Sequence, residues 1–140
     1  MEEDFKAIRD RFYDSLAAIG IPESQILMDN GAGKDVNEKK PWARFQIRPG
    51  ENREEVIGGT TVIVTQIGQI ILQVFGPKGS GAEGTYVTAH KFSEAYRKWA
   101  SVSPSGHVRA YWSGYRPIAS DEFLQVNASV YYESKRRYPR

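Results

Sequence analysis

Apolar residues recur every three or four positions near the start of the chain, which is the spacing of an amphipathic helix. The pattern predicts a helix over residues 3–19 with a polar opposite face. The acidic residues 2–4 lie where the helix dipole favours negative charge. Gly20 and Pro22 then supply the signals that end a helix. The apolar stripe consists of Phe5, Ile8, Phe12, Leu16 and Ile19.

The pattern then changes to the alternation of a β-strand. Residues 42–48 alternate apolar and polar, which predicts a strand with one buried and one solvated face. We expect Pro49 and Gly50 to end this strand. A short apolar run at residues 26–28 predicts a minor strand before it. The turn-forming residues between them predict a surface loop over residues 29–41.

Two further apolar segments predict a β-hairpin. Residues 60–67 are rich in Thr, Val and Ile, and residues 70–75 form a second β-rich run. We expect a tight turn near Gly68 to join them as antiparallel strands. Gly76 and Pro77 then end the second strand.

A second helix is predicted after a glycine-rich loop. Ser80 and Glu83 have the spacing of a capping box, so we expect the helix to begin near Gly81. Its apolar face is mostly aromatic and continues to Trp99, which we place in the core against the sheet. This face is formed by Ala82, Tyr86, Ala89, Phe92, Tyr96 and Trp99.

Alternation returns twice in the last third of the chain. Residues 108–112 and residues 124–132 predict two strands, with loops at 101–106 and 114–120. The alternation places Trp112 in the core. A basic segment, residues 135–140, follows, and we expect a disordered or partner-docking terminus there.

The order of these elements predicts an α+β fold. We expect one largely antiparallel sheet of about five strands, with two helices packed on one face. Residues 1–134 form a single domain and residues 135–140 form a basic C-terminal tail. The uncovered sheet face is then polar, and it carries Arg44, Arg48, Arg109, Gln125 and Tyr131.

Composition narrows the possible functions. The 140 residues include no cysteine, which excludes disulfides and thiolate chemistry. A formal net charge of +2 is too balanced to indicate a nucleic-acid partner by itself. No apolar run approaches membrane-spanning length, and the acidic N-terminus is not that of a signal peptide, so we expect no membrane partner.

Candidate catalytic and cofactor motifs are weak. Residues 79–84 read G-x-G-x-x-G, but Glu83 would place negative charge beside a pyrophosphate, and the strands before it look like hairpins. The two histidines, His90 and His107, lack metal-binding spacing, and no Ser-His-Asp arrangement is visible. We therefore expect no enzyme activity, no cofactor and no metal.

An interaction surface is the better-supported site. Tyr111, Trp112, Tyr115 and Arg116 bring together residue types that are enriched at protein–protein interfaces. The candidate interface residues are Arg44, Arg48, Lys78, Arg109, Tyr111, Tyr115 and Arg116.

Several of these segments, in this order, resemble a known family. They are an N-terminal helix, the strand Pro-Trp-Ala-Arg-Phe-Gln-Ile at residues 41–47, the strand and glycine loop at residues 68–81, and a final strand rich in Val and Tyr. Together they resemble the tail terminator proteins of long-tailed bacteriophages, the minor tail protein U-like group, which includes a small prophage-encoded domain family. The resemblance covers roughly Phe5 to Glu133, and leaves out the loop at residues 30–40 and the residues after Ser134.

This resemblance implies a structural role without a reaction. Such a protomer assembles as a ring, typically a hexamer, on the head-proximal end of the tail tube, where it stops tube polymerisation. The implied partners are other copies of the chain, the tail tube protein and a head-completion protein. The implied location is the virion tail, and the host bacterial cytoplasm during assembly.

A second function from another class stays open. A small nucleic-acid-binding domain could use Arg44, Arg48, Arg109 and the basic tail to contact phosphates. An enzyme ranks third, because the glycine-rich loop is its only support in the sequence.

Overall fold

The computed structural model describes residues 2–29, 35–79, 83–119 and 123–139. Its strands form one six-stranded sheet in the order β1-β2-β3-β6-β5-β4. β1 pairs with β2 in parallel, and every other neighbouring pair is antiparallel. The elements are α1 (Glu2–Asp14), α2 (Leu16–Ile19), a 3-10 turn (Glu23–Gln25), β1 (Ile26–Leu27), β2 (Trp42–Ile57), β3 (Thr61–Pro77), α3 (Glu83–Ala95), β4 (Ala100–Ser103), β5 (Gly106–Ile118) and β6 (Phe123–Pro139).

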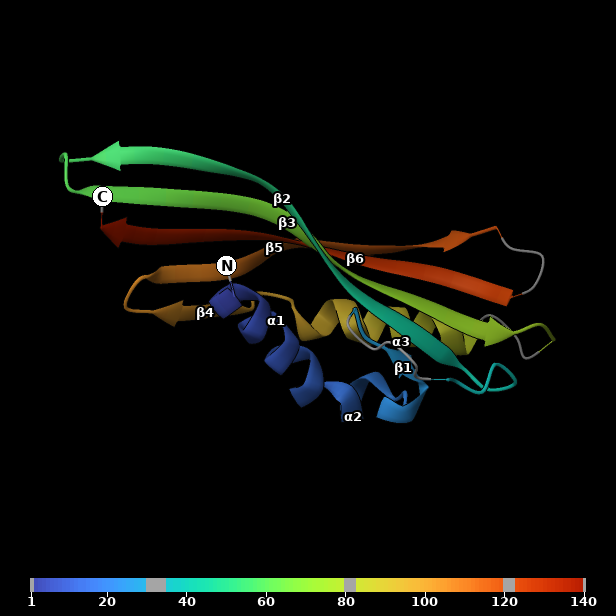
Figure 1. Ribbon diagram of the computed structural model, residues 1–140. Coiled ribbons are helices and arrows are strands. Elements are labelled where there is room, and N and C mark those ends of the chain that lie inside the picture. Colours follow the sequence, from blue (N-terminus) through green and yellow to red (C-terminus); the bar gives the residue numbers. More distant parts are fainter. Residues whose placement is uncertain (1, 30–34, 80–82, 120–122, 140) are drawn as a thin grey trace.

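The predicted fold class is wrong. The protein is mostly sheet, with 54% of the described residues in strands and 26% in helices, and its mixed sheet curls into a half-barrel. Three short helices accompany the sheet, and they lie on one side of it (Figure 1). The prediction underestimated the sheet because three of the strands, β2, β3 and β5, continue through glycines and prolines at which we expected a turn, a loop or an end, and β6 continues past its predicted end.

β2 shows the first such continuation. The strand passes through Pro49 and Gly50 and shifts register against β3 between Pro49 and Asn52. Pro49 is tolerated because β1 pairs only with residues 43 and 44, so β2 is an edge strand at this point and no ladder partner needs the missing N–H. Gly50 approaches the Ile67 carbonyl so closely that a side chain would collide with it.

β3 shows the second continuation. The expected turn at Gly68 does not form, because Gly68 pairs with both Pro49 and Tyr132 inside one uninterrupted strand. The hairpin between β2 and β3 instead turns at Gly58 and Gly59, whose φ angles of +66° and +77° suit glycine. The result is a long hairpin that extends past the helices (Figure 1).

The remaining strands are also longer than predicted. The turn between β4 and β5 occupies residues 104 and 105, inside the segment expected to be a loop. β5 continues through Gly114 as far as Ile118. Residues 135–139, expected to form a disordered or partner-docking terminus, are the end of β6 and pair with β3 along their length.

The helices follow the predicted pattern more closely. α1 and α2 cover the predicted first helix with a break at Ser15, and Gly20 caps α2 in the left-handed conformation. The predicted start of α3 near Gly81 lies outside the described residues. The helix ends at Ala95, so Tyr96 and Trp99 lie beyond it, with Tyr96 fully buried and Trp99 partly exposed. In the described segments, no helix is both long and apolar enough to cross a bilayer.

The core lies between the helices and one face of the sheet. Phe12 of α1 stacks on Phe45 of β2 with ring centroids 4.3 Å apart, and Phe92 of α3 meets both rings edge-on. The Tyr96 hydroxyl donates to the Ile8 carbonyl over 2.7 Å. Burial of this hydroxyl raises the pKa of Tyr96, so it stays a donor and ties α1 to the end of α3.

Candidate assembly interface

Among the described residues, the second face of the sheet carries no helix, and five of the candidate interface residues belong to it. Since Phe45 packs on α1, its neighbour Arg44 points to the opposite side. The register places Arg44 beside Gln73, Gln73 beside Asn127, and Asn127 beside Arg116. One polar row therefore crosses the sheet, with an exposed arginine at each end.

Arg48 begins a second row on this open face. It lies beside Gln69, which lies beside Tyr131, which lies beside Trp112. The prediction that Trp112 belongs to the core is wrong, because its side chain is 54% exposed and packs edge-on against Tyr131 at 5.2 Å.

A β-bulge explains the misplaced tryptophan. β5 shifts register between Ala110 and Trp112, so Tyr111 is an extra residue. Ala110 pairs with the buried Tyr132, whereas Trp112 pairs with Tyr131 on the open face. A strict alternation of buried and exposed positions cannot predict the faces of both Ala110 and Trp112, because the bulge between them reverses which face each following residue occupies.

Arg109 and Tyr111 complete the group on the open face. The Arg109 guanidinium lies 5.8 Å from the centre of the Tyr111 ring and 3.4 Å from a Glu133 carboxylate oxygen. The Tyr111 ring lies 6.2 Å from that of Tyr131. Arg109 is therefore held in place by an aromatic ring and a partly exposed acid.

Two candidate interface residues lie elsewhere. Tyr115 is on the helix side of the sheet, where its ring meets Tyr86 and His90 of α3 edge-on at 6.3 Å and 5.9 Å. Lys78 is exposed just beyond the end of β3. The structure thus brings Arg44, Arg48, Arg109, Tyr111 and Arg116 to one face and separates Lys78 and Tyr115 from it. Their role in an interface stays a prediction.

The open face also has an aromatic end that the sequence analysis missed. Trp42 and Phe75 are cross-strand neighbours whose rings stack at 4.0 Å, and Phe123 closes the group edge-on. These residues lie on the side away from α1, although Trp42 and Phe75 are less than a tenth exposed. The alternation of residues 42–48 could have predicted the position of Trp42, because it places Trp42 on the same face as Arg44.

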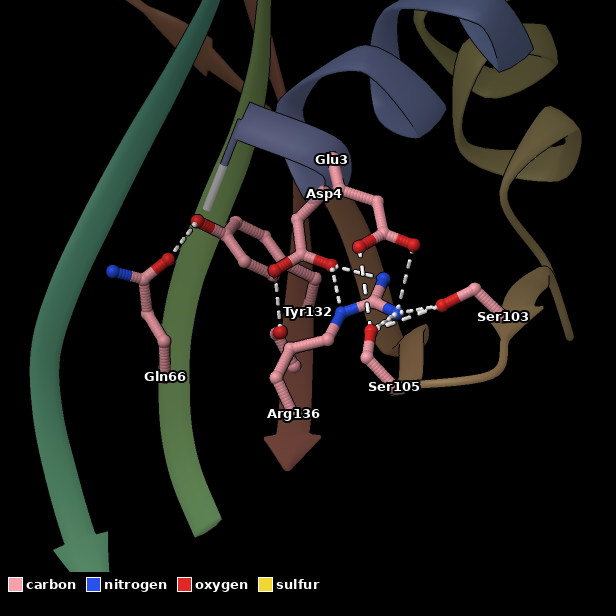
Figure 2. Close-up of polar contacts among 8 residues, drawn as sticks. Glu3, Asp4, Gln66, Ser103, Ser105, Tyr132 and Arg136 are labelled. Atoms are coloured by element: carbon pink, nitrogen blue, oxygen red, sulfur yellow. Dashed lines mark hydrogen bonds and ion pairs between the residues drawn. The ribbon is translucent and has the colours of Figure 1, made fainter. Parts of the chain in front are cut away.

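A buried polar cluster links the two ends of the chain, and Figure 2 shows how its members converge. The Arg136 guanidinium donates to Asp4 Oδ1 through Nε at 3.0 Å and through Nη2 at 2.5 Å. The Ser134 hydroxyl donates to the other oxygen of Asp4. The third guanidinium nitrogen, Nη1, donates to Ser103 at 2.6 Å and to Glu3 at 3.3 Å.

This cluster is satisfied by its own members. Asp4 and Arg136 are only 1% and 2% exposed, and each has hydrogen-bond partners inside the protein. The hydrogen bond from Ser103 and the charge of Arg136 hold the pKa of the Glu3 carboxyl below its usual value. The geometry is that of a structural connection between α1, β6 and the β4–β5 turn. The sequence feature that could have revealed this connection is the alternation of β6, which continues past Ser134 to Arg136.

Tyr132 adjoins the cluster and is fully buried. Its hydroxyl donates to the Gln66 side-chain oxygen over 3.2 Å (Figure 2). Burial, together with the nearby negative charge of Asp4, raises the pKa of Tyr132 to about 12.

The described residues of the other candidate motifs do not come together in one site. Residues 80–82 of the G-x-G-x-x-G motif lie outside the described residues. His90 is exposed on α3 and His107 is partly buried on β5, on separate elements of the sheet and its covering layer. Across the described ranges, no three His, Cys, Asp or Glu side chains are grouped so that they could hold a metal ion.

Comparisons with known proteins add evidence on the fold. No family model matches the chain, and no curated protein matches it. Nine chains of solved structures do match. One of them, named only by a sequence identifier that states no activity, superimposes with a TM-score of 0.63 at 17% identity, over 95% of this chain and 96% of that chain. At this identity the similarity establishes a shared fold over nearly the whole chain and nothing about function.

Proposed function

We propose that this protein is a structural subunit that assembles into a ring, in the manner of a phage tail terminator. In that role it caps the tail tube, stops tube polymerisation and joins the tube to the head. Its partners are other copies of itself, the tail tube protein and a head-completion protein, and it acts in the virion tail after assembly in the host bacterial cytoplasm.

One structural observation supports the proposal independently of the sequence resemblance. One sheet face, with two polar rows that contain Arg44, Arg48 and Arg116 and with the exposed aromatic residues Tyr111 and Trp112, carries no helix among the described residues. Aromatic residues and arginine are enriched where proteins meet. Exposed sheet edges, a liability in a monomer, also find a use in a ring.

The first test is the size of the protein as a function of its concentration. The exposed surface is polar for an obligate oligomer, so we expect a monomer or weak association when dilute and rings when concentrated. Sedimentation velocity measures the size, and negative-stain electron microscopy should show closed rings. A tight dimer at every concentration would contradict the ring. Deleting the gene from the phage that encodes it should give tails of uncontrolled length.

Nucleic-acid binding remains the second candidate, because Arg44, Arg48, Arg109 and Arg116 share one face. The basic tail contributes less than expected, since the Arg136 guanidinium is buried against Asp4. Binding to a short DNA duplex, measured at several salt concentrations, tests this candidate. Affinity that falls steeply with salt and is lost in Arg44→Ala would favour it.

A further inference from the structure

Among the described residues, the sheet has two long edges without a partner strand. β2 pairs with β1 only at residues 43 and 44, so within the described segments residues 50–57 have a neighbour only on the β3 side. β5 pairs with β4 only over residues 106–109, and the Trp99 carbonyl accepts the last backbone bond, from Ala110. Beyond Ala110, β5 has a described neighbour only on the β6 side.

These edges lie at opposite ends and on opposite sides of the sheet. The free part of β2 belongs to the hairpin end, where β3 meets the last residues of β6. The free part of β5 lies along residues 125–131 of β6, at the other end (Figure 1). Two different edges that meet head to tail build a heterologous contact, and such a contact forms a ring when its rotation closes.

The two edges carry opposite charge. Residues 50–57 hold Glu51, Glu54 and Glu55 against one base, Arg53, and every residue in this segment is exposed. Residues 111–118 of β5 hold one cation, Arg116, and no acid, and Arg109 lies just before them. Arg116 is exposed and has no ion-pair partner in the described part of the chain.

A hollow lies beside the point where the free edge of β5 begins. It has a volume of about 580 Å³ and is open to solvent. Two further cations, Arg97 and Lys98, line it together with Trp99, Tyr111 and Trp112. Three cations, including Arg109, and four aromatic residues, including Tyr96, thus line the hollow at the start of the free edge of β5.

We propose that the acidic edge of β2 in one copy pairs with the basic edge of β5 in the next copy. This inference rests on the proposed ring and specifies the two surfaces that form it. Pro49 and Pro117, which have no N–H to donate, mark the limits of the two pairing segments. The contact adds backbone hydrogen bonds along the strands, and the charges select the partner edge.

Charge reversal in the full-length chain tests the pairing. One variant carries Glu54→Lys and Glu55→Lys, and the other carries Lys98→Glu and Arg116→Glu. All four side chains are exposed, so both variants should fold like the parent, which circular dichroism can verify. A control with Asp14→Lys and Glu38→Lys makes the same charge change as the first variant, but outside residues 50–57 and 111–118.

We expect each variant alone to assemble about tenfold more weakly or worse, because like charges then face each other across the contact. An equimolar mixture should recover assembly, since each variant offers the edge that the other needs. The control should assemble as the parent does. Sedimentation velocity measures the parent, both variants, their mixture and the control. Hydrogen exchange of the parent should show that residues 50–57 and 111–116 become protected on assembly.

Other outcomes separate this proposal from the ring itself. If the parent forms rings and both variants do so equally well, the pairing is wrong while the ring stands. If each variant fails and the mixture fails too, the opposite charges do not face each other and the pairing is again wrong. If the parent stays monomeric at every concentration, the ring is wrong, and the pairing is wrong with it.

Discussion

At the scale of single residues, the least expected feature is a charged pair inside the protein. The side chains of Arg136 and Asp4 are 3% and 1% exposed. Their attraction is offset by the cost of removing both from water, so the pair as a whole adds little net stability. Removing one partner is different, because the other charge then remains buried and uncompensated.

We predict that Arg136→Met lowers the free energy of unfolding by about 3–5 kcal/mol. The double variant Asp4→Leu with Arg136→Met should be more stable than the single one, because no charge is left unpaired. Lys135→Met, on the exposed neighbouring residue, should stay within about 0.5 kcal/mol of the parent. Urea unfolding measures all three. A double variant no more stable than Arg136→Met would show that charge burial is not the cause.

Tyr132 gives the protein a predicted sensitivity to alkali. The pKa of this tyrosine rises from 10.0 to about 12 on folding. Between these values the unfolded chain has released a proton that the folded protein retains, so stability that is present below pH 10 is lost as the pH approaches 12. The Tyr132→Phe variant should show a smaller loss over this interval.

The comparison needs a baseline and a control. Tyr132→Phe loses the hydrogen bond to Gln66, so it should be less stable at neutral pH by about 0.5–1.5 kcal/mol. Tyr13→Phe changes an exposed tyrosine and serves as the control. Urea unfolding at several pH values between 8 and 12 gives the slopes. Equal slopes in Tyr132→Phe and the parent would mean that Tyr132 is not the responsible group.

At the scale of elements, Gly68 allows β3 to continue as one uninterrupted strand. A Cβ atom at this position would lie 2.6 Å from the Tyr132 ring and 2.7 Å from the Arg48 carbonyl oxygen. The glycine is therefore required for close packing inside a strand, where the sequence analysis expected a turn.

We predict that Gly68→Ala destabilises the protein by about 1–3 kcal/mol, because the strand or Tyr132 must shift. Gly84→Ala is the matched control. A Cβ atom at Gly84 meets nothing within 4 Å, and alanine favours a helix by up to about 1 kcal/mol. Thermal unfolding distinguishes the two, and a neutral Gly68→Ala would contradict the packing seen around Tyr132.

These positions show how far the sequence alone could predict the fold. The period of α1 correctly places Ile8 and Phe12 in the core, because a helix pattern is local. Residues that commonly end a strand are harder to interpret from the sequence. Pro49 is tolerated because it lies on a free edge, and Gly68 fits because its cross-strand neighbours leave no room for a side chain. Both causes lie in segments distant in sequence, so a local pattern cannot reveal them.

The candidate interface shows the same limit. The alternation of β2 correctly places Arg44 and Arg48 on the face opposite Phe45. It fails in β5, where the bulge at Tyr111 moves Trp112 to the open face. Arg136 was missed because a basic segment at the end of a chain usually lies in solvent.

At the scale of the whole molecule, the sheet is longer than the layer of helices that covers it (Figure 1). The middle of β3 is buried on both faces, whereas residues 50–57 of β2 are exposed throughout. Local stability should follow this difference, since exposed backbone with few buried contacts opens readily.

We predict that hydrogen exchange in dilute protein is fastest at residues 50–57 and slowest at residues 70–75. In the second segment, β3 has strand neighbours on both sides and buried side chains, so exchange there requires opening of the core. Mass spectrometry of peptides from each segment measures the rates. Uniform protection in the two segments at low concentration would contradict this gradient.

The Asp4–Arg136 pair also sets an order of events when the protein is made. Asp4 is synthesised 132 positions before the arginine whose guanidinium neutralises it. β3, at the centre of the sheet, likewise waits for β6 before it has a second neighbour. The growing chain therefore cannot complete this sheet before β6 has been made. Folding should begin only when synthesis of β6 is almost complete, which leaves the apolar strands dependent on chaperones until then.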